Sequence, residues 1–175
     1  MIKKIVIPIL AIVIVIVSFI ISCQKNTPVT NNICDGLITD TAGTNDNAMI
    51  VVPNAFSPNY DGINDWLKIF YKNIQTTDVK IYDSSKNIVF STTDINAKWI
   101  PKEDSIKTTS IYHYSIQATT NSNHKIGICG YIYRFDNYCI PKNLSISDLH
   151  FEDQLLIDYT FDYETNDPIV KIQCQ

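Results

Sequence analysis

Residues 5–21 form an apolar run of 17 residues without a single charge, and no other feature constrains the fold as strongly. Lys3 and Lys4 precede the run, and Ser22 and Cys23 follow it. A positively charged start, an apolar stretch and a small residue at the cleavage position are typical of a secretory signal peptide. The run has no polar face, so we do not expect it to form a core helix of the folded domain. An uncleaved anchor helix is the alternative, because 17 residues lie near the lower limit for spanning a bilayer.

The four residues Ile20-Ile21-Ser22-Cys23 resemble the lipobox of bacterial lipoproteins. The resemblance implies that residues 1–22 are removed and that the thiol of Cys23 is acylated as the new N-terminus. It also implies attachment to the outer membrane or the cell surface, because Gln24 stands where inner-membrane lipoproteins of enteric bacteria carry an aspartate. We therefore expect a lipid-anchored chain outside the cytoplasm. The anchor-helix alternative would tether the chain to a membrane as well.

The charge pattern argues against nucleic acid as a partner. The chain has a formal net charge of −4, with 14 basic and 18 acidic residues. Thirteen of the basic residues are lysines and one is Arg134. Proteins that bind nucleic acids present a basic patch rich in arginine, and the sequence offers none. We expect the membrane, and an envelope protein or a surface glycan, to be the partners instead.

Four cysteines remain once Cys23 is assigned to the lipid, namely Cys34, Cys129, Cys139 and Cys174. An even number of cysteines in an exported chain favours two disulfides, for which three connectivities are possible. We expect Cys34 to pair with Cys129 and Cys139 to pair with Cys174. The first bond would attach the incoming chain to an edge of the sheet, and the second would close a loop around the C-terminal segment. A Cys129–Cys139 bond is the rival pairing, whereas a zinc site would need closely spaced cysteines that the chain lacks.

Short strand-like runs separated by turn-rich pieces dominate the sequence from residue 50 onwards. In residues 111–119, Tyr112, Tyr114 and Ile116 alternate with other residues, which is the period of a half-buried strand. Thirty isoleucines and ten tyrosines strengthen this preference, because β-branched and aromatic side chains suit a pleated surface. The other runs of this kind span residues 50–53, 66–70, 78–82, 87–90 and 125–135. We therefore predict an all-β fold, an antiparallel β-sandwich of the immunoglobulin-like type.

This pattern divides the chain into four parts. They are a signal peptide (1–22), a flexible polar tether (23–49), a β-sandwich domain (50–135) and a disulfide-stapled C-terminal extension (136–175). Within the extension, SISDLHFEDQLL (145–156) is the candidate for a short helix, with Ser145 or Ser147 as its cap.

The most specific stretch after the lipobox is VVPNAFSPNYDGINDWLKIF, residues 51–70. It closely resembles the opening of the gliding motility-associated C-terminal domain, also called the type B sorting domain, of Bacteroidota secreted and surface proteins. The matching residues are Pro53, Asn54, Phe56, Pro58, Asn59, Asp61, Gly62, Asn64 and Asp65. The resemblance covers roughly residues 50–135 and implies a domain associated with gliding or secretion. Because 40 residues follow Phe135, whereas the family's domain closes its protein, it implies a fold and a bacterial group more than a sorting address.

The turn within this motif is a candidate cation site. Asn59, Asp61 and Asp65 place oxygens around a sharp glycine turn, as in the first half of a calcium-binding loop. Lys68 occupies the position at which a complete loop has its glutamate, so the ligand set is incomplete. The alternative is a hydrogen-bonded turn in which the side chains cap backbone amides and Gly62 has a positive φ. We expect the turn and no cofactor, with calcium as the weaker hypothesis.

Two classes of function fit these features. The first is a membrane-anchored, non-enzymatic envelope lipoprotein with a structural, adhesion or gliding- and secretion-associated role. We expect no enzyme, because His113, His124 and His150 lie in no catalytic motif. The alternative is a lipid-anchored glycan-binding or hydrolytic accessory protein that uses the acidic C-terminal segment and the exposed aromatic residues.

The acidic segment provides the test between these two classes. Its members are Asp148, Glu152, Asp153, Asp158, Asp162, Glu164 and Asp167. Such a density of acidic residues usually marks a solvent-exposed face. Aromatic residues in strands usually belong to the core, and we expect this of Trp66 and Trp99. A pocket at which two of the carboxylates converge would favour the alternative, because glycosidases use such pairs.

Overall fold

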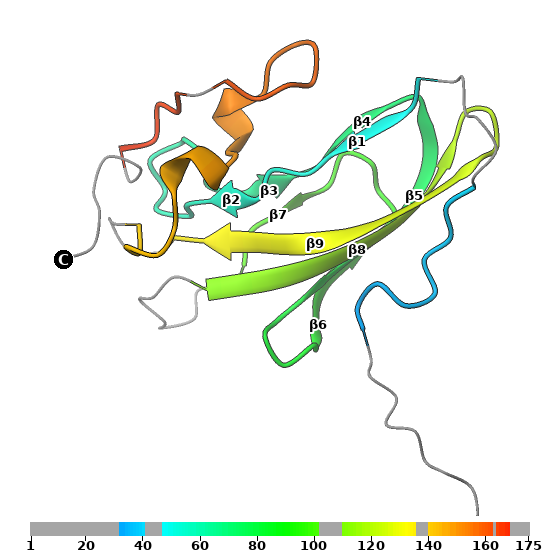
Figure 1. Ribbon diagram of the computed structural model, residues 1–175, viewed down its shortest axis with the longest axis horizontal. Coiled ribbons are helices and arrows are strands. Elements are labelled where there is room, and N and C mark those ends of the chain that lie inside the picture. Colours follow the sequence, from blue (N-terminus) through cyan, green and yellow to red (C-terminus); the bar gives the residue numbers. More distant parts are fainter. Residues whose placement is uncertain (1–31, 41–46, 102–109, 136–139, 163, 169–175) are drawn as a thin grey trace, which may run out of the picture. The chain divides into compact units, whose positions relative to one another are not determined.

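Two long strands form the middle of the structure, at the places where apolar and polar residues alternate. Strand β8 (Ser110–Thr120) and strand β9 (Lys125–Arg134) pair in antiparallel fashion along their whole length (Figure 1). Ile116 and Ala118 lie on one face of this hairpin and are buried. The alternation predicted for residues 111–119 is therefore confirmed.

The computed structural model describes residues 32–40, 47–101, 110–135, 140–162 and 164–168. Residues Ile33–Gln175 form one unit and Met1–Asn32 another, and the fold described below is that of the first unit. The signal peptide, the lipidation site Cys23 and the expected Cys139–Cys174 pair lie outside the described residues. No helix in the described part of the chain is long and apolar enough to cross a membrane.

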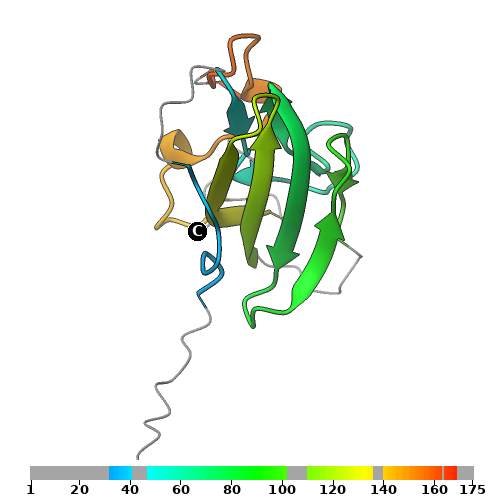
Figure 2. The same cartoon turned by 90° about the vertical axis from the view of Figure 1, so that its right-hand side faces the viewer.

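The hairpin lies within a five-stranded sheet with the order β2-β9-β8-β5-β6. The remaining three strands are β2 (Ala55–Phe56), β5 (Ile74–Tyr82) and β6 (Ile88–Thr92). Figure 2 shows the long strands side by side. All neighbours are antiparallel except β2, which runs parallel to β9.

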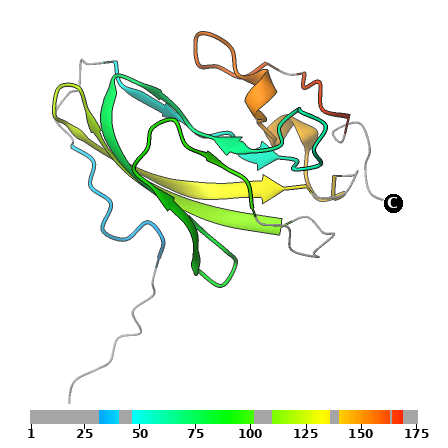
Figure 3. The same ribbon diagram turned by 180° about the vertical axis from the view of Figure 1, so that it is seen from behind.

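Two short ribbons cover one face of this sheet (Figure 3). One ribbon consists of β1 (Met49–Val51) and β4 (Phe70–Lys72), and the other of β3 (Leu67–Lys68) and β7 (Lys98–Trp99). Between the sheet and the ribbons lie two clusters of buried apolar side chains. The first contains Phe56, Leu67, Ile81, Trp99 and Ile132, and the second contains Ile69, Val79 and Ile116. The predicted all-β sandwich, rich in antiparallel pairs, is confirmed.

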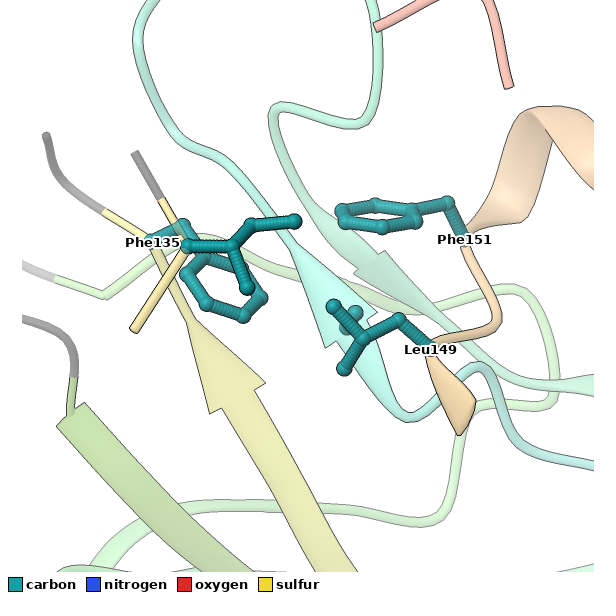
Figure 4. Packing of buried hydrophobic residues seen from close by; sticks show 5 residues of the cluster. Phe135, Leu149 and Phe151 are labelled. Atoms are coloured by element: carbon teal, nitrogen blue, oxygen red, sulfur yellow. The ribbon is translucent and has the colours of Figure 1, made fainter. Parts of the chain in front are cut away.

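The C-terminal extension packs on the opposite face of the sheet. Successive residues of a strand point to opposite faces, so Ala55 points away from the core that contains Phe56. Figure 4 shows the cluster on this side, in which Leu149 and Phe151 approach Phe135 from the extension. Its members are Ala55, Phe135, Ile140, Leu149 and Phe151, each at most 2% exposed.

The extension contains two 3-10 turns in place of the expected helix. They are η1 (Ile146–Asp148) and η2 (Glu152–Gln154). Ser145 precedes η1 but its side chain makes no capping hydrogen bond, so the helix has no start signal. The backbone between the turns is extended, with ψ of 132° at Leu149 and 162° at Phe151. The short α-helix considered for this segment is thus replaced by two 3-10 turns, because the side chains of Leu149 and Phe151 are buried in the hydrophobic cluster.

Residues 33–40, which the sequence places in a flexible tether, are bonded to the sheet. Cys34 forms a disulfide with Cys129 of β9, with Cα atoms 5.6 Å apart. This is the first of the two pairings expected from the sequence. The bond connects positions separated by 95 residues, so it closes almost the whole sandwich into one loop.

The same segment covers the part of the β9 edge that β2 leaves unpaired. The Asp40 backbone N–H donates to the Lys125 carbonyl oxygen at 3.0 Å, and the Gly127 N–H donates to the Thr39 hydroxyl at 2.9 Å. A β-carbon at Gly127 would lie 2.7 Å from the Cβ of Leu37, so this close approach requires glycine. Unpaired strand edges promote association between molecules, and here the edge is covered at both ends.

Candidate functional site

The motif at residues 57–65 folds into a turn whose side chains bind its own backbone. The Asp65 carboxylate accepts the backbone N–H of Tyr60 at 2.6 Å and that of Gly62 at 2.8 Å. Asp61 accepts the N–H two positions further on at 2.8 Å. Gly62 has a φ of 91°, which an L-residue rarely adopts. The motif therefore specifies its own conformation locally.

The three candidate calcium ligands are engaged in this turn. Asn59 Oδ1 accepts the Asp61 N–H at 3.1 Å, and Asn59 Nδ2 donates to Asp61 Oδ2 at 2.9 Å. Asp65 uses both carboxylate oxygens for backbone amides. Among the residues that the structure describes, no group of three His, Cys, Asp or Glu side chains is placed to hold a metal ion. The geometry is that of the hydrogen-bonded turn.

A second set of motif side chains binds the C-terminal extension. The side chain of Asn54 bonds to the backbone of the extension. Its Oδ1 accepts the His150 N–H at 2.7 Å, and its Nδ2 donates to the Asp148 carbonyl oxygen at 2.8 Å. The Asn54 backbone N–H also donates to the His150 carbonyl oxygen at 3.0 Å. These bonds hold the start of the extension against β2.

Asn64 makes the corresponding contact at the other end of the motif. It is 5% exposed and has a φ of 55°, which aims its side chain at the extension. Its Oδ1 accepts the Asp153 N–H at 3.1 Å, and its Nδ2 donates to Asp153 Oδ1 at 2.9 Å and to Asp167 Oδ2 at 3.2 Å. The hydroxyl of Ser57 donates to the same oxygen of Asp167. We call this surface, residues 54–66 against residues 148–167, the motif–extension junction.

Asp153 organises the extension side of this junction. Its carboxylate accepts the Thr165 hydroxyl at 2.8 Å and the Asn166 N–H at 2.6 Å, besides the amide of Asn64. Both oxygens are therefore used within the protein. Asp153 therefore supports the shape of the junction.

A pocket of about 660 Å³ opens at the junction. Its walls include Ile63, Trp66, Phe70, Glu152, Leu155 and Asn166. Two acidic residues of the extension, Glu152 and Asp153, line it together, as the alternative function requires. Asp153 is held by the hydrogen bonds given above, and Oε2 of Glu152 is buried from solvent.

Two polar atoms of residues that line this pocket are buried from solvent and make no hydrogen bond of regular geometry. They are Nε1 of Trp66 and Oε2 of Glu152. Burial raises the pKa of Glu152, and the nearby Lys98, Lys68 and Trp66 N–H oppose that rise. The Lys98 ammonium lies 3.7 Å from the centre of the Trp66 ring, so a positive charge already occupies the aromatic surface.

The two tryptophans, both expected in the core from the sequence, lie in different environments. Trp99 is 5% exposed and packs in the core against Phe56 and Tyr112, with ring centroids at 5.6 and 4.9 Å. Trp66 lines the pocket. Sequence reasoning missed the roles of Asn54 and Asn64, because nothing in the local sequence indicates partners in the extension.

A family model matches the segment that contains the turn and the sandwich. Residues 50–133 match the CHU_C Type IX secretion signal domain. The resemblance to the gliding motility-associated and sorting domain family is thereby confirmed, and the match supports a secretion- or gliding-associated role. The family is a non-catalytic domain family associated with the cell envelope or surface. The matched range ends before the extension, which nevertheless completes the cluster around Ala55 and Phe135.

Other comparisons are weaker. No curated protein matches the chain significantly. Among solved structures, CopC from Methylosinus trichosporium OB3b shares 11% sequence identity, with a TM-score of 0.38 over 56% of this chain and 99% of that one. A likeness of this size supports no conclusion about fold or function.

Proposed function

We propose that this chain is a lipid-anchored lipoprotein of the outer membrane or cell surface whose β-sandwich acts as a non-enzymatic interaction module. The match of residues 50–133 to a secretion signal domain is the observation that carries the proposal. The lipobox-like Ser22-Cys23 pair supplies the point of attachment.

Two structural features support an exported, structural role. The Cys34–Cys129 disulfide is of a kind that persists in oxidising compartments outside the cytoplasm. The extension binds Asn54, Ser57 and Asn64 of the motif, so the motif acts as part of a closed domain. The motif is thus hydrogen-bonded into the folded domain, with Tyr60–Gly62 exposed at its tip, and this arrangement favours an interaction module.

Metabolic labelling tests the lipid anchor. The chain and its Cys23→Ala variant are expressed in a Bacteroidota host that is fed an alkyne-tagged fatty acid, and the tag is detected on the purified protein. We expect the parent chain to be labelled and the variant to accumulate as an unlabelled precursor that retains residues 1–22. Gln24→Ala is the matched control and should be labelled as the parent is. Labelling of Cys23→Ala would contradict the proposal.

Envelope fractionation tests the location and the partner. We expect the labelled chain in the outer-membrane fraction. Chemical crosslinking followed by mass spectrometry should then identify an envelope protein that contacts the surface of the β-sandwich. Recovery of the parent chain in the soluble periplasmic fraction would overturn the anchored form of the proposal.

A further inference from the structure

We propose that strand β6 is a self-association site, at which two copies of this chain pair in antiparallel fashion across a two-fold axis near Phe90. The partner is a second copy of the chain, and the contact joins the five-stranded sheets of both copies into one continuous sheet. The inference goes beyond the proposed function, because it requires neither the lipid anchor nor an envelope protein.

The two edges of the five-stranded sheet differ in what covers them. At the β9 edge, β2 pairs with one end and residues 33–40 bond to the other. Strand β6 ends the sheet order, and Figure 2 shows it at the outer margin of the sheet. Within the part of the chain that the structure describes, β6 pairs with β5 and no strand pairs with its outer side. An edge of this kind is a template for pairing with another chain.

The sequence of β6 lacks the residues that usually discourage such pairing. The strand reads IVFST, with no lysine and no proline. Its first two residues are apolar and remain accessible, since Ile88 is 56% and Val89 43% exposed. An edge strand that is uncharged and partly apolar gains from being covered by a second strand.

The charges at the two ends of β6 favour a second copy as the partner. Lys86 lies two residues before the strand and Asp94 two residues after it, and both are exposed. An antiparallel pair centred near Phe90 places Lys86 of each copy next to Asp94 of the other. A parallel pair would instead place lysine next to lysine and aspartate next to aspartate. Opposite charges across two strands stabilise the pair, whereas like charges destabilise it.

An apolar hollow beside β6 enlarges the contact. It has a volume of about 410 Å³ and lies between β6 and β7, with Val89, Phe90 and Ile100 among its walls. Ile100 is 49% exposed, so the apolar surface continues from the strand onto the rim of the hollow. A two-fold axis brings the same surface of both copies together, so each copy covers the apolar side chains that the other exposes.

The cover of the β9 edge limits the assembly to two copies. Once two β6 strands pair, both outer edges of the joined sheet are β9 edges, which β2 and residues 33–40 cover. The contact is therefore closed and does not grow into a filament. It is also small, because β6 has five residues and a bulge against β5 lies in its first half. We expect a weak dimer that forms at concentrations of about 0.1–1 mM.

Sedimentation equilibrium of the full chain in a density-matched detergent measures this association. The charge variants are Lys86→Asp, Asp94→Lys and the double swap that combines them. Aspartate tolerates the φ of 67° at position 86. Ile88→Lys places a charge on the edge itself. Ile157→Lys is its matched control, because Ile157 is 100% exposed in the C-terminal extension.

We expect the parent chain to show an equilibrium between monomer and dimer. Each single charge variant places like charges at both ends of the contact and should weaken the dimer by roughly 10-fold. The double swap restores opposite charges and should bring the affinity back to within about threefold of the parent. Ile88→Lys should weaken the dimer by more than about 10-fold, whereas Ile157→Lys should associate as the parent does.

The double swap separates charge pairing from damage to the loop after β6. The Asp94 carboxylate also accepts the Asn96 N–H at 2.9 Å, and Asp94→Lys removes this bond. The double swap lacks the same bond, so its recovery reports the pairing of charges between copies. An unchanged Tm of Ile88→Lys shows that this variant is folded.

Zero-length crosslinking with a carbodiimide tests the register with the parent chain alone. The two ends of β6 are roughly 25 Å apart within one copy, so Lys86 and Asp94 can be joined only between copies. An equal mixture of ¹⁴N- and ¹⁵N-labelled chains should give Lys86–Asp94 peptides that contain one light and one heavy partner.

Several results would overturn the inference. They are a parent chain that stays monomeric up to about 1 mM, growth beyond two copies, no recovery in the double swap, or equal weakening by Ile88→Lys and Ile157→Lys. Crosslinking of Lys86 or Asp94 to a different envelope protein in the host, with the purified chain monomeric, would assign the edge to that protein instead. None of these results would change the fatty-acid labelling of Cys23.

Discussion

The two segments that flank the sandwich are attached to it by opposite means. Residues 33–40 have no buried side chain, and a disulfide and polar contacts along the β9 edge hold them. Residues 140–168 instead insert Leu149 and Phe151 into a hydrophobic cluster and add polar contacts at the junction. A segment that buries little needs a covalent bond, whereas one that buries large apolar side chains holds itself in place.

This difference predicts that the extension is part of the core, and Phe151→Ala tests it with the largest expected effect. The side chain is fully buried against Phe135, so its removal should lower the free energy of unfolding by about 3–5 kcal/mol. Chemical denaturation followed by circular dichroism measures the change. Ile157→Ala is the control, because Ile157 is 100% exposed in the same extension. A Phe151→Ala variant as stable as the parent would refute an integral extension.

Loss of the disulfide should act on the other segment. Replacing both Cys34 and Cys129 by serine should destabilise the fold by about 2–4 kcal/mol, since it frees the unfolded chain from a long loop. Amide hydrogen exchange should rise most in residues 33–40 and least in residues 140–162. Equal loss of protection in both segments would show that the two attachments are not independent.

The polar part of the junction should contribute less. Asn64 and Asn73 both have a φ of 55°, so alanine costs the same backbone strain at either position. Asn64 is buried and binds Asp153, whereas Asn73 is exposed. We expect Asn64→Ala to destabilise by about 1–3 kcal/mol more than Asn73→Ala in thermal unfolding. Equal destabilisation by the two substitutions would show that Asn64 contributes only its turn conformation and not its hydrogen bonds to the extension.

The smallest effect should come from Glu152, and it should depend on pH. Burial raises the pKa of this carboxyl above its usual 4.5, against the opposing effects of Lys98, Lys68 and Trp66, while Asp153 adds to the rise. The folded state therefore holds the proton more tightly than the unfolded state, and stability falls as the pH rises from 4.5 through the folded pKa. Glu152→Gln should flatten this fall, as measured by Tm between acidic and neutral pH. A variant curve parallel to that of the parent would contradict the assignment.

The strands were predictable because their signals are local. The alternation in residues 111–119 requires only the sequence itself, and the hairpin of β8 and β9 follows from it. The turn at residues 57–65 was predictable for the same reason, because Asp65 binds backbone amides three and five positions away. In both cases the interacting residues are close in sequence, so the sequence pattern also indicates which residues interact.

The junction and the pocket were not predictable because their partners are distant. Asn64 and Asp153 are 89 positions apart, and no periodicity connects them. The acidic segment looks like a solvated face, yet Asp167 is fully buried and Asp153 is a hydrogen-bonding centre. The extended backbone at Leu149 also depends on a tertiary cluster and not on helix propensity.

These distant contacts determine when the chain can finish folding. The hydrogen bond between Ser57 and Asp167 joins residues 110 positions apart. Contacts between residues so far apart in sequence form slowly. A chain emerging from the ribosome or a translocation channel presents its motif well before the residues that cover it. Until residues 148–167 are present, Ala55 and Phe135 lack the Leu149 and Phe151 side chains that bury them. The contacts that complete the domain therefore form only after residues 148–167 have been made.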